Sequence, residues 1–295
     1  MIIISYVQTF LGDIKQTPND RVLCWLGLNY VSANHTAARD KYEPKTGSWF
    51  LTSDTFIEWS NALNSSLWLH GKPGFGKTIL SSSIIEHVIG LCKARPPDQC
   101  AYFYFDFNRE WNATDMLRSI VAQLCTRKTR IPPEVHNLYR ECISHHLKPD
   151  INKLREIFVS FLSSSHRTFI VLDALDECPK TERKRLLETI KTIIDVSPLY
   201  LNILVTSREE EDIEDKFEDL AINSVAIQSS DVQVDILRHV HKRLSKDKEF
   251  KAWGPDIKEN VEKVLIKKSQ GMYDAQACCA NDHQVQDGRM PTETS

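Results

Sequence analysis

Residues 71–78 follow the pattern GxxxxGKT, in which the residue types and their spacing suit the binding of phosphate groups. Glycines allow successive backbone N–H groups to turn toward one anion, a lysine reaches the outer phosphates, and a threonine hydroxyl ligates magnesium. The pattern therefore predicts a nucleoside triphosphate and Mg²⁺ as ligands; the alternative is an ordinary glycine-rich turn before a helix. The residues of the predicted loop are Gly71, Lys72, Pro73, Gly74, Phe75, Gly76, Lys77 and Thr78.

A carboxylate directly follows another apolar run, residues 168–172. This residue, Asp173, would stand at the carboxyl end of a buried strand. There it can hold the magnesium ion that the Thr78 hydroxyl also contacts, so Asp173 is the predicted acidic metal ligand. The alternative is an acid that caps the next helix.

Two further acids, Asp176 and Glu177, lie close behind Asp173. Hydrolysis of a triphosphate needs a group that orients or deprotonates the attacking water, and a carboxylate bound to a metal is poorly suited to that task. One of these two acids is therefore the candidate general base, and the sequence does not rank them. Their alternative role is to stabilise a helix N-terminus through the helix dipole.

The apolar run at 202–206 leads to Arg208, which we expect at the same carboxyl edge of the sheet, where ligands of open α/β sheets bind. From there the guanidinium can sense the γ-phosphate. The alternative is a salt bridge to residues 209–219, which contain eight acids and a single lysine. That acidic segment itself is predicted to be the solvated face of a helix.

Five short apolar runs alternate with segments of helical periodicity, which is typical of a parallel sheet with helices on both faces. The sequence therefore predicts an α/β fold, the three-layer α/β/α sandwich of P-loop NTPases with a five-stranded parallel sheet. The second run lies between the run that precedes the phosphate-binding loop (the loop strand) and the run that precedes Asp173 (the Asp173 strand). It is an extra strand of the kind that separates these two motifs in hydrolysing P-loop ATPases. The runs are residues 67–70, 101–105, 168–172, 202–206 and 224–227.

Apolar residues spaced by three or four positions predict the helices. The first predicted helix begins at the phosphate-binding loop, and its apolar stripe contains Leu80, Ile84, Val88 and Leu91. Further helices are predicted over residues 116–124, 154–162, 185–194, 232–244 and 257–266.

The domain organisation follows from these elements. Residues 1–60 are expected to form a helical lead-in or linker, residues 61–273 the P-loop domain, and residues 274–295 a disordered tail, because the last segment is polar and lacks periodicity. The aromatic residues between Trp49 and Trp59 are expected in the core; packing beside a nucleotide base is the alternative.

Composition excludes several classes of function. The chain of 295 residues is 41% hydrophobic and 26% charged, and no apolar run approaches the roughly 20 residues that span a bilayer. We therefore expect no membrane contact. Residues 1–7 lack the basic region of a secretory signal and are soon followed by Asp13 and Lys15, so we expect an intracellular, cytoplasmic protein. A net charge of -3 gives no general attraction for nucleic acid, which is not an expected partner. The eight cysteines include no CxxC pair, which favours buried reduced thiols.

Taken together, the loop, the acids and the arginine resemble the NACHT family of signal-transducing ATPases, and most closely its nephrocystin-like N-terminal group from filamentous fungi. The resemblance covers roughly residues 20–273. The small residue Ala174 after the metal-binding acid, followed by two more acids, is more specific than the loop, which many NTPases share. The segments that carry the resemblance are residues 46–51, 67–74, 117–120 and 172–178.

The resemblance implies ATP as the nucleotide, Asp173 as the magnesium ligand, Asp176 and Glu177 as the acids that act on water, and Arg208 as the sensor. It also implies a switch that controls self-association or protein partners. Relatives place an effector segment before this domain and a winged-helix region with ankyrin or WD repeats after it. The sequence after Tyr273 departs from the family pattern, which suggests a truncation or an altered reading frame.

Three functions are compatible with these patterns. The leading one is a switch domain that binds Mg-ATP and hydrolyses it slowly. The second is an interaction module that binds nucleotide without turnover. A small-molecule kinase fits less well, because no compact segment supplies the arginine-rich lid that such an enzyme would need.

Overall fold

The structure is a computed structural model that describes residues 17–128, 130–163, 167–196, 200–246, 250–251 and 253–269. The predicted tail at 274–295 and the first 16 residues of the predicted lead-in lie outside these ranges.

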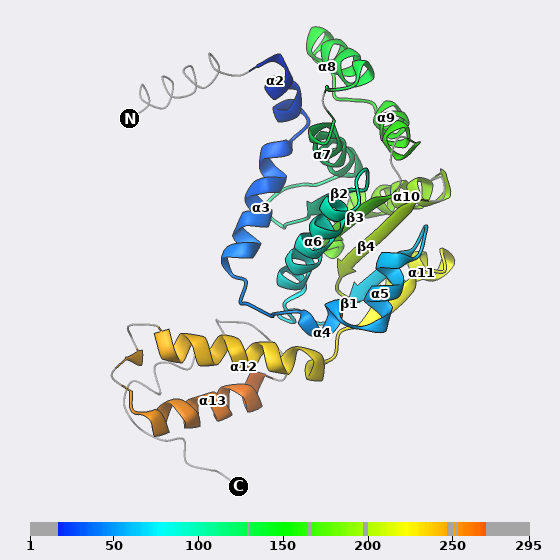
Figure 1. Ribbon diagram of the computed structural model, residues 1–295. Coiled ribbons are helices and arrows are strands. Elements are labelled where there is room, and N and C mark those ends of the chain that lie inside the picture. The colour runs from blue at the N-terminus through cyan, green and yellow to red at the C-terminus, as the bar shows by residue number, and fades with distance from the viewer. Residues whose placement is uncertain are drawn as a thin grey trace.

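A five-stranded parallel sheet lies at the centre, in the order β2-β3-β4-β1-β5, and confirms the predicted fold class (Figure 1). Each predicted apolar run corresponds to one strand. In the paired register Leu69 lies beside Thr206, and Leu172 lies beside Val205, so the loop strand, the Asp173 strand and the Arg208 strand end at one edge. The strands are β1 (Ser66–His70), β2 (Gln99–Tyr104), β3 (Thr168–Asp173), β4 (Leu201–Ser207) and β5 (Asn223–Ala226).

One expectation about the sheet is wrong. The strand that separates β1 from β3 in space is β4, whereas β2, which contains the run 101–105, lies at the edge beyond β3. The connection from β1 to β2 passes over two strand positions, which β3 and β4 later fill, because neighbours in sequence need not be neighbours in a sheet. Arg208, at the end of β4, therefore stands between the loop and the acids.

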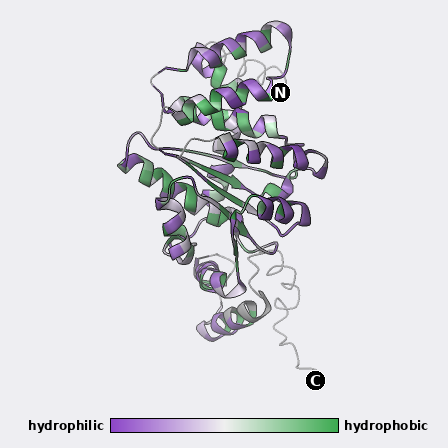
Figure 2. Cartoon of the chain, turned by 90° about the vertical axis from the view of Figure 1, so that its right-hand side faces the viewer, coloured by the Kyte–Doolittle hydropathy of each residue, from purple (hydrophilic) through white to green (hydrophobic). Residues whose placement is uncertain are grey.

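Helices cover both faces of the sheet, as the alternating pattern predicted. Figure 2 shows the apolar strands between helices whose outer surfaces are hydrophilic. Alternate residues of β3 divide between two cores: Ile170 and Leu172 face one helical layer, and Phe169 and Val171 face the other. The covering helices are α6 (Lys77–Ala94), α7 (Ala113–Thr126), α9 (Ile151–Ser163), α10 (Lys180–Val196) and α11 (Glu211–Asp219).

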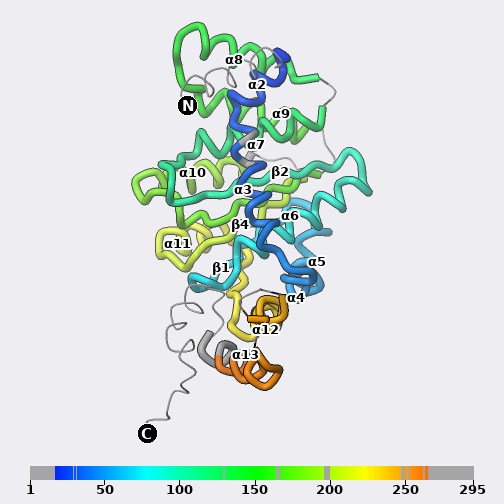
Figure 3. The backbone as a smooth tube through the Cα atoms, turned by 90° about the vertical axis from the view of Figure 1, so that its left-hand side faces the viewer, coloured from blue at the N-terminus to red at the C-terminus, as the bar shows by residue number. Residues whose placement is uncertain are grey.

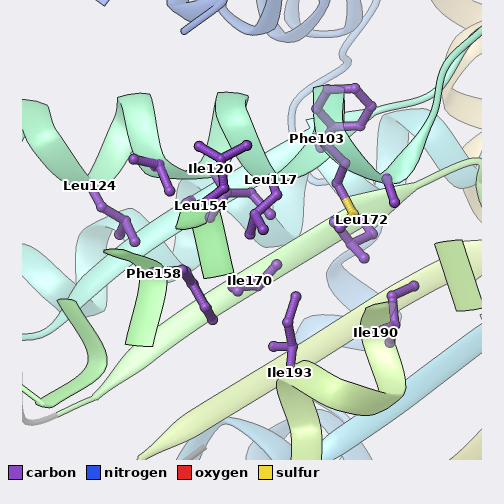
Figure 4. Packing of buried hydrophobic residues seen from close by; sticks show 14 of the residues in the cluster. Phe103, Leu117, Ile120, Leu124, Leu154, Phe158, Ile170, Leu172, Ile190 and Ile193 are labelled. Carbon is purple, nitrogen blue, oxygen red and sulfur yellow. The ribbon is translucent and has the colours of Figure 1, made fainter. Parts of the chain in front are cut away.

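The larger core lies between the sheet and helices α7, α9, α10 and α11. Fully buried side chains such as Phe158 each contribute about 1.5–3 kcal/mol relative to an exposed position. Figure 4 shows this packing for Phe103, Leu117, Ile120, Leu124, Leu154, Phe158, Ile170, Leu172, Ile190 and Ile193.

The described part of the lead-in, residues 17–60, is mostly helical and contributes to the core. Phe50, Phe56 and Trp59 are at most 2% exposed, which confirms their predicted core role, and the Trp59 indole N–H donates to the Ile203 carbonyl at 3.0 Å. Figure 3 shows α2 and α3 running one after the other along one side of the molecule. The helices are α2 (Pro18–Trp25), α3 (Leu28–Asp40), α4 (Ser48–Leu51) and α5 (Asp54–Asn61).

Three more helices complete the described part of the chain. The sequence did not predict α8 (Pro133–His145), a helix whose buried residues are limited to Val135, Leu138 and Cys142. Helices α12 (Ser229–Lys246) and α13 (Pro255–Ser269) match the last two predicted helices and pack on each other beyond β5 (Figure 1). No helix among the described residues is long and apolar enough to cross a membrane. Five of the six cysteines in these ranges are buried, Cys24 is half-buried, and no disulfide joins the six.

Candidate functional site

The predicted phosphate-binding loop connects β1 to α6, which begins at Lys77. Gly74 and Gly76 have φ angles of 79° and 72°, in the left-handed region where a side chain would be strained. Gly71 lies so close to the strand-to-helix connection after β5 that an added Cβ would stand 3.3 Å from the Ile227 Cβ. The buried ring of Phe75 anchors the loop, while Lys72, Pro73, Gly74 and Thr78 are exposed.

The Lys77 ammonium reaches back over the loop. Its Nζ donates to the carbonyl oxygens of Gly71 at 2.6 Å and Lys72 at 3.0 Å. Burial lowers the pKa of Lys77, and the nearby carboxylates of Asp176 and Asp173 oppose that shift. The lysine is therefore held at the loop from which it would reach the outer phosphates.

Asp173 ends β3 with its carboxylate fully enclosed and 1% exposed. Its Oδ1 accepts hydrogen bonds from the Ser81 hydroxyl at 2.5 Å and the Thr206 hydroxyl at 2.7 Å, and the Thr78 side chain also hydrogen-bonds to the carboxyl group. Burial raises the pKa of Asp173 although these hydroxyls and Lys77 act in the opposite direction. Since the Thr78 hydroxyl and the Asp173 carboxylate touch, this pair of hard oxygen ligands fits a magnesium ion.

A left-handed turn at Ala174, with φ 56° and ψ 48°, directs the chain across the edge of the sheet. The Ala174 N–H donates to the Thr206 hydroxyl at 3.0 Å, so Thr206 fixes both the Asp173 carboxylate and the turn after it. A 3₁₀ turn, η1 (Leu175–Glu177), follows and carries the two remaining acids. A β-branched residue would be strained in this left-handed conformation, which explains why a small residue occupies position 174.

Both oxygens of the Asp176 carboxylate contact Arg208. It is 7% exposed, its Oδ1 accepts the Arg208 backbone N–H at 3.0 Å, and its Oδ2 lies 3.2 Å from the Arg208 Nε. The Arg208 guanidinium also lies over the Phe107 ring, 5.6 Å from its centroid. The predicted alternative partner of Arg208 was the acidic segment, whereas the structure pairs it with Asp176.

The Glu177 carboxylate remains partly accessible at the same edge. Burial raises the pKa of Glu177 to about 7, and the negative charges of Asp176 and Asp173 act in the same direction. Arg208 and the backbone N–H of Phe107 favour the charged form but do not cancel these effects. A carboxylate with this pKa accepts a proton near neutral pH, so the geometry favours Glu177 over Asp176 as the general base.

A pocket of about 390 Å³ opens beside the acids. Several of its residues were not predicted from the sequence, because they belong to a loop after β2 and to the start of α10, whose approach depends on the tertiary fold. The only local signal was the acidic run, which begins with Glu209 and supplies Glu210. The lining residues are Phe107, Asn108, Arg109, Glu110, Asp176, Glu177, Cys178, Pro179, Lys180, Arg183, Arg208 and Glu210.

The chain is similar to one described family and to individual proteins. The family model described as "Nephrocystin 3, N-terminal" matches residues 45–208, more than half of the chain, and this range contains every predicted site residue. The vegetative incompatibility protein HET-E-1 of Podospora anserina is 33% identical over 178 residues, which cover 58% of this chain and 13% of that protein. The chain thus spans about an eighth of this relative.

Among solved structures, the Aeropyrum pernix ORC2 protein in its ADPNP-ADP complexes aligns with a TM-score of 0.51 and 17% sequence identity. The alignment covers 84% of this chain and 64% of that chain. At this identity the likeness concerns the fold, which is the three-layer arrangement of P-loop ATPases.

Proposed function

Because the chain belongs to the nephrocystin 3 N-terminal family, we propose that it is a NACHT-type switch domain that binds Mg-ATP and hydrolyses it slowly. The observation that carries this proposal is the position of Glu177: a carboxylate with a pKa of about 7 stands at the sheet edge shared with the phosphate-binding loop. The phosphate-binding loop by itself supports only nucleotide binding by an NTPase-like domain. The accessible base supports turnover as well.

Each group around the loop has a defined part in binding. The backbone N–H groups of residues 71–78 would surround the phosphates, and Lys77 would neutralise the outer ones. Thr78 and Asp173 would hold Mg²⁺, which when bound offsets the charge of the phosphate oxygens. Ser81 and Thr206 keep the Asp173 carboxylate in one orientation through their hydrogen bonds.

For hydrolysis, Glu177 would take a proton from a water molecule as the water oxygen attacks the γ-phosphorus, and ADP would leave. Asp176 would not act on water, because both of its oxygens are engaged by Arg208. That pairing also occupies the Arg208 Nε and leaves the terminal nitrogens of the guanidinium for the γ-phosphate. A sensor that is partly committed to another carboxylate stabilises the transition state less, which supports slow rather than fast turnover.

The family resemblance supports ATP over GTP and a role in signalling through self-association or protein partners. We propose a cytoplasmic location, which is supported by the lack of disulfides among the six cysteines of the described ranges. Nucleic acid is not among the proposed partners, since a net charge of -3 gives no general attraction for it.

The test compares phosphate release by the purified chain with release by its Glu177→Gln variant. We expect ATP affinity to remain within about twofold and turnover to fall by about 10²–10⁴, the usual contribution of a general base. Asp176→Asn should not reproduce the loss of turnover seen in Glu177→Gln, since it leaves the candidate base intact and removes only the ion pair between Asp176 and the Arg208 guanidinium. Glu110→Gln, which removes an exposed carboxylate from the same pocket, is the matched control and should leave turnover unchanged. A parent chain that binds ATP but releases no phosphate above Glu177→Gln would support the interaction module without turnover.

A further inference from the structure

A buried arginine lies directly behind the candidate base. Arg183, in the first turn of α10, is 3% exposed. Its Nη2 donates to the carbonyl oxygen of Asp176 at 2.6 Å and approaches that of Cys178 at 3.3 Å. These two carbonyls belong to the residues immediately before and after Glu177. One nitrogen of one side chain therefore holds the backbone on both sides of the base.

The other terminal nitrogen of Arg183 points to the acidic segment after β4. Its Nη1 lies 3.0 and 3.3 Å from the two carboxylate oxygens of Asp212, and 3.5 Å from the Glu210 Oε2. Lys180 also pairs with Glu210, at 3.3 Å. The guanidinium thus joins η1 to the start of α11, two segments that are separated in sequence by the whole of α10 and β4.

The guanidinium is suited to this position in a way that other cations are not. Its planar fork offers donors in fixed directions, so it can hold two carbonyls on one side and two carboxylates on the other. A lysine would present a single charge without that geometry. Enclosing a cation is costly unless it is paired and hydrogen-bonded, and Asp212 and Glu210 provide the pairing.

We propose that Arg183 is a positioning residue for hydrolysis: it fixes Glu177 through the backbone carbonyls on either side, and the acids that begin α11 anchor it. This inference rests on the proposed hydrolytic function and deepens it. We call these contacts of Arg183, with the carbonyls of Asp176 and Cys178 and with the Asp212 carboxylate, the Arg183 clamp. The acidic segment thus has a role beyond solvation, because Asp212 holds the Arg183 guanidinium in place. Arg183 does not line the phosphate-binding loop, so nucleotide affinity should not depend on it.

The test uses Arg183→Lys, with ATP affinity and turnover measured separately. Displacing a reactive group by about 1 Å can cost as much as 10² in rate, so we expect turnover to fall by about tenfold to hundredfold. ATP affinity should stay within about twofold. Lys191→Gln is the matched control, since it breaks an exposed ion pair with Asp195 on the same helix and should change neither quantity.

Asp212 provides an independent variant, because its side chain is 46% exposed and its replacement does not empty the core. Asp212→Asn should lower turnover in the same direction as Arg183→Lys but less, and Asp212→Glu should restore most of it. A merely structural role predicts instead that turnover and ATP affinity fall together with thermal stability. That result, or unchanged turnover in both Arg183→Lys and Asp212→Asn, would overturn the proposal.

Amide hydrogen exchange separates this inference from the hydrolytic function. The amides of Glu177 and Cys178 donate to the carbonyls of Ala174 at 2.9 Å and Leu175 at 3.1 Å, and their exchange reports whether η1 is held. We expect faster exchange at these amides in Arg183→Lys and normal exchange in Lys191→Gln. If the parent chain shows no turnover but this difference appears, the proposed hydrolysis fails and the clamp stands. Equal exchange in all three proteins would refute the clamp.

Discussion

At the scale of single residues, the site separates two neighbouring carboxylates by their surroundings. Asp176 is buried and both of its oxygens contact Arg208, whereas the half-buried Glu177 carboxylate has no ion pair among the described residues and burial raises its pKa to about 7. The sequence places these acids side by side and cannot rank them. The ranking comes from Arg208 on β4, which only the folded sheet brings beside them.

The pH dependence of turnover should follow Glu177. Its base form is required, and since its pKa is raised to about 7, phosphate release should rise as the pH increases through about 7 and level off above it. Steady-state rates from pH 5.5 to 9 at saturating Mg-ATP measure this limb. A profile that is already flat at pH 5.5 would contradict the assignment of Glu177 as the base.

The same raised pKa predicts a stability effect. A pKa that rises from 4.5 in the unfolded chain to about 7 in the folded chain favours folding fully below pH 4.5, and this contribution is lost as the pH rises through about 7. Glu177→Gln should therefore stabilise the protein at pH 8 by about 1–2 kcal/mol, a value reduced for the partial exposure of the side chain. At pH 4.5 the gain should vanish. Urea unfolding at both pH values checks the sign.

Lys77 should govern binding. Replacing it with alanine removes charge-assisted contacts worth about 1.5–3 kcal/mol, which corresponds to a roughly tenfold to hundredfold loss of nucleotide affinity. Isothermal titration with a slowly hydrolysed ATP analogue measures the change. An unchanged affinity would argue against residues 71–78 as the phosphate-binding loop.

At the scale of elements, the lead-in connects the phosphate-loop helix to α12. The Gly47 N–H donates to the buried Asp235 carboxylate of α12 at 2.8 Å, and Arg238 on the same helix pairs with Asp235 and donates to the Lys45 carbonyl. On its other side Gly47 abuts Leu80 of α6. The turn at Gly47 therefore lies between the helix that starts at the nucleotide site and the first helix beyond the sheet.

Gly47→Ala should destabilise the protein. Gly47 has a φ of 76°, and an added Cβ would stand 2.7 Å from the Leu80 Cδ1, so we expect a loss of about 1–3 kcal/mol in the free energy of unfolding. Gly90→Ala is the control of opposite sign: nothing lies within 4 Å of its added Cβ, and the helix α6 should gain up to about 1 kcal/mol. Denaturant unfolding of both variants distinguishes strain at Gly47 from a general effect of the substitution.

At the scale of the whole molecule, the sequence predicts what is local and misses what the topology creates. The phosphate-binding loop can be predicted from its contiguous GxxxxGKT pattern, and the five strands from their contiguous apolar runs. Asp173 can be predicted because it directly follows one of these runs. The position of β2 at the edge, the Asp176–Arg208 pair and the Arg183 clamp each join residues far apart in the chain. Helix α8 escapes prediction because its buried stripe is short and polar residues surround it.

Self-association is the whole-molecule property that the proposed switch requires. Phe107 is 66% exposed at the pocket beside Glu177, so a second copy that covers this edge would bury it. We expect light scattering to show a larger mass with Mg²⁺ and a slowly hydrolysed ATP analogue than with ADP, and Phe107→Ser to reduce that increase. Leu63→Ser is the matched control. Leu63 is 54% exposed but precedes β1, so it lies near the amino ends of the strands, whereas the pocket lies at their carboxyl ends. A mass that is the same with both nucleotides, at concentrations where both are bound, would mean that this domain alone does not convert nucleotide state into assembly.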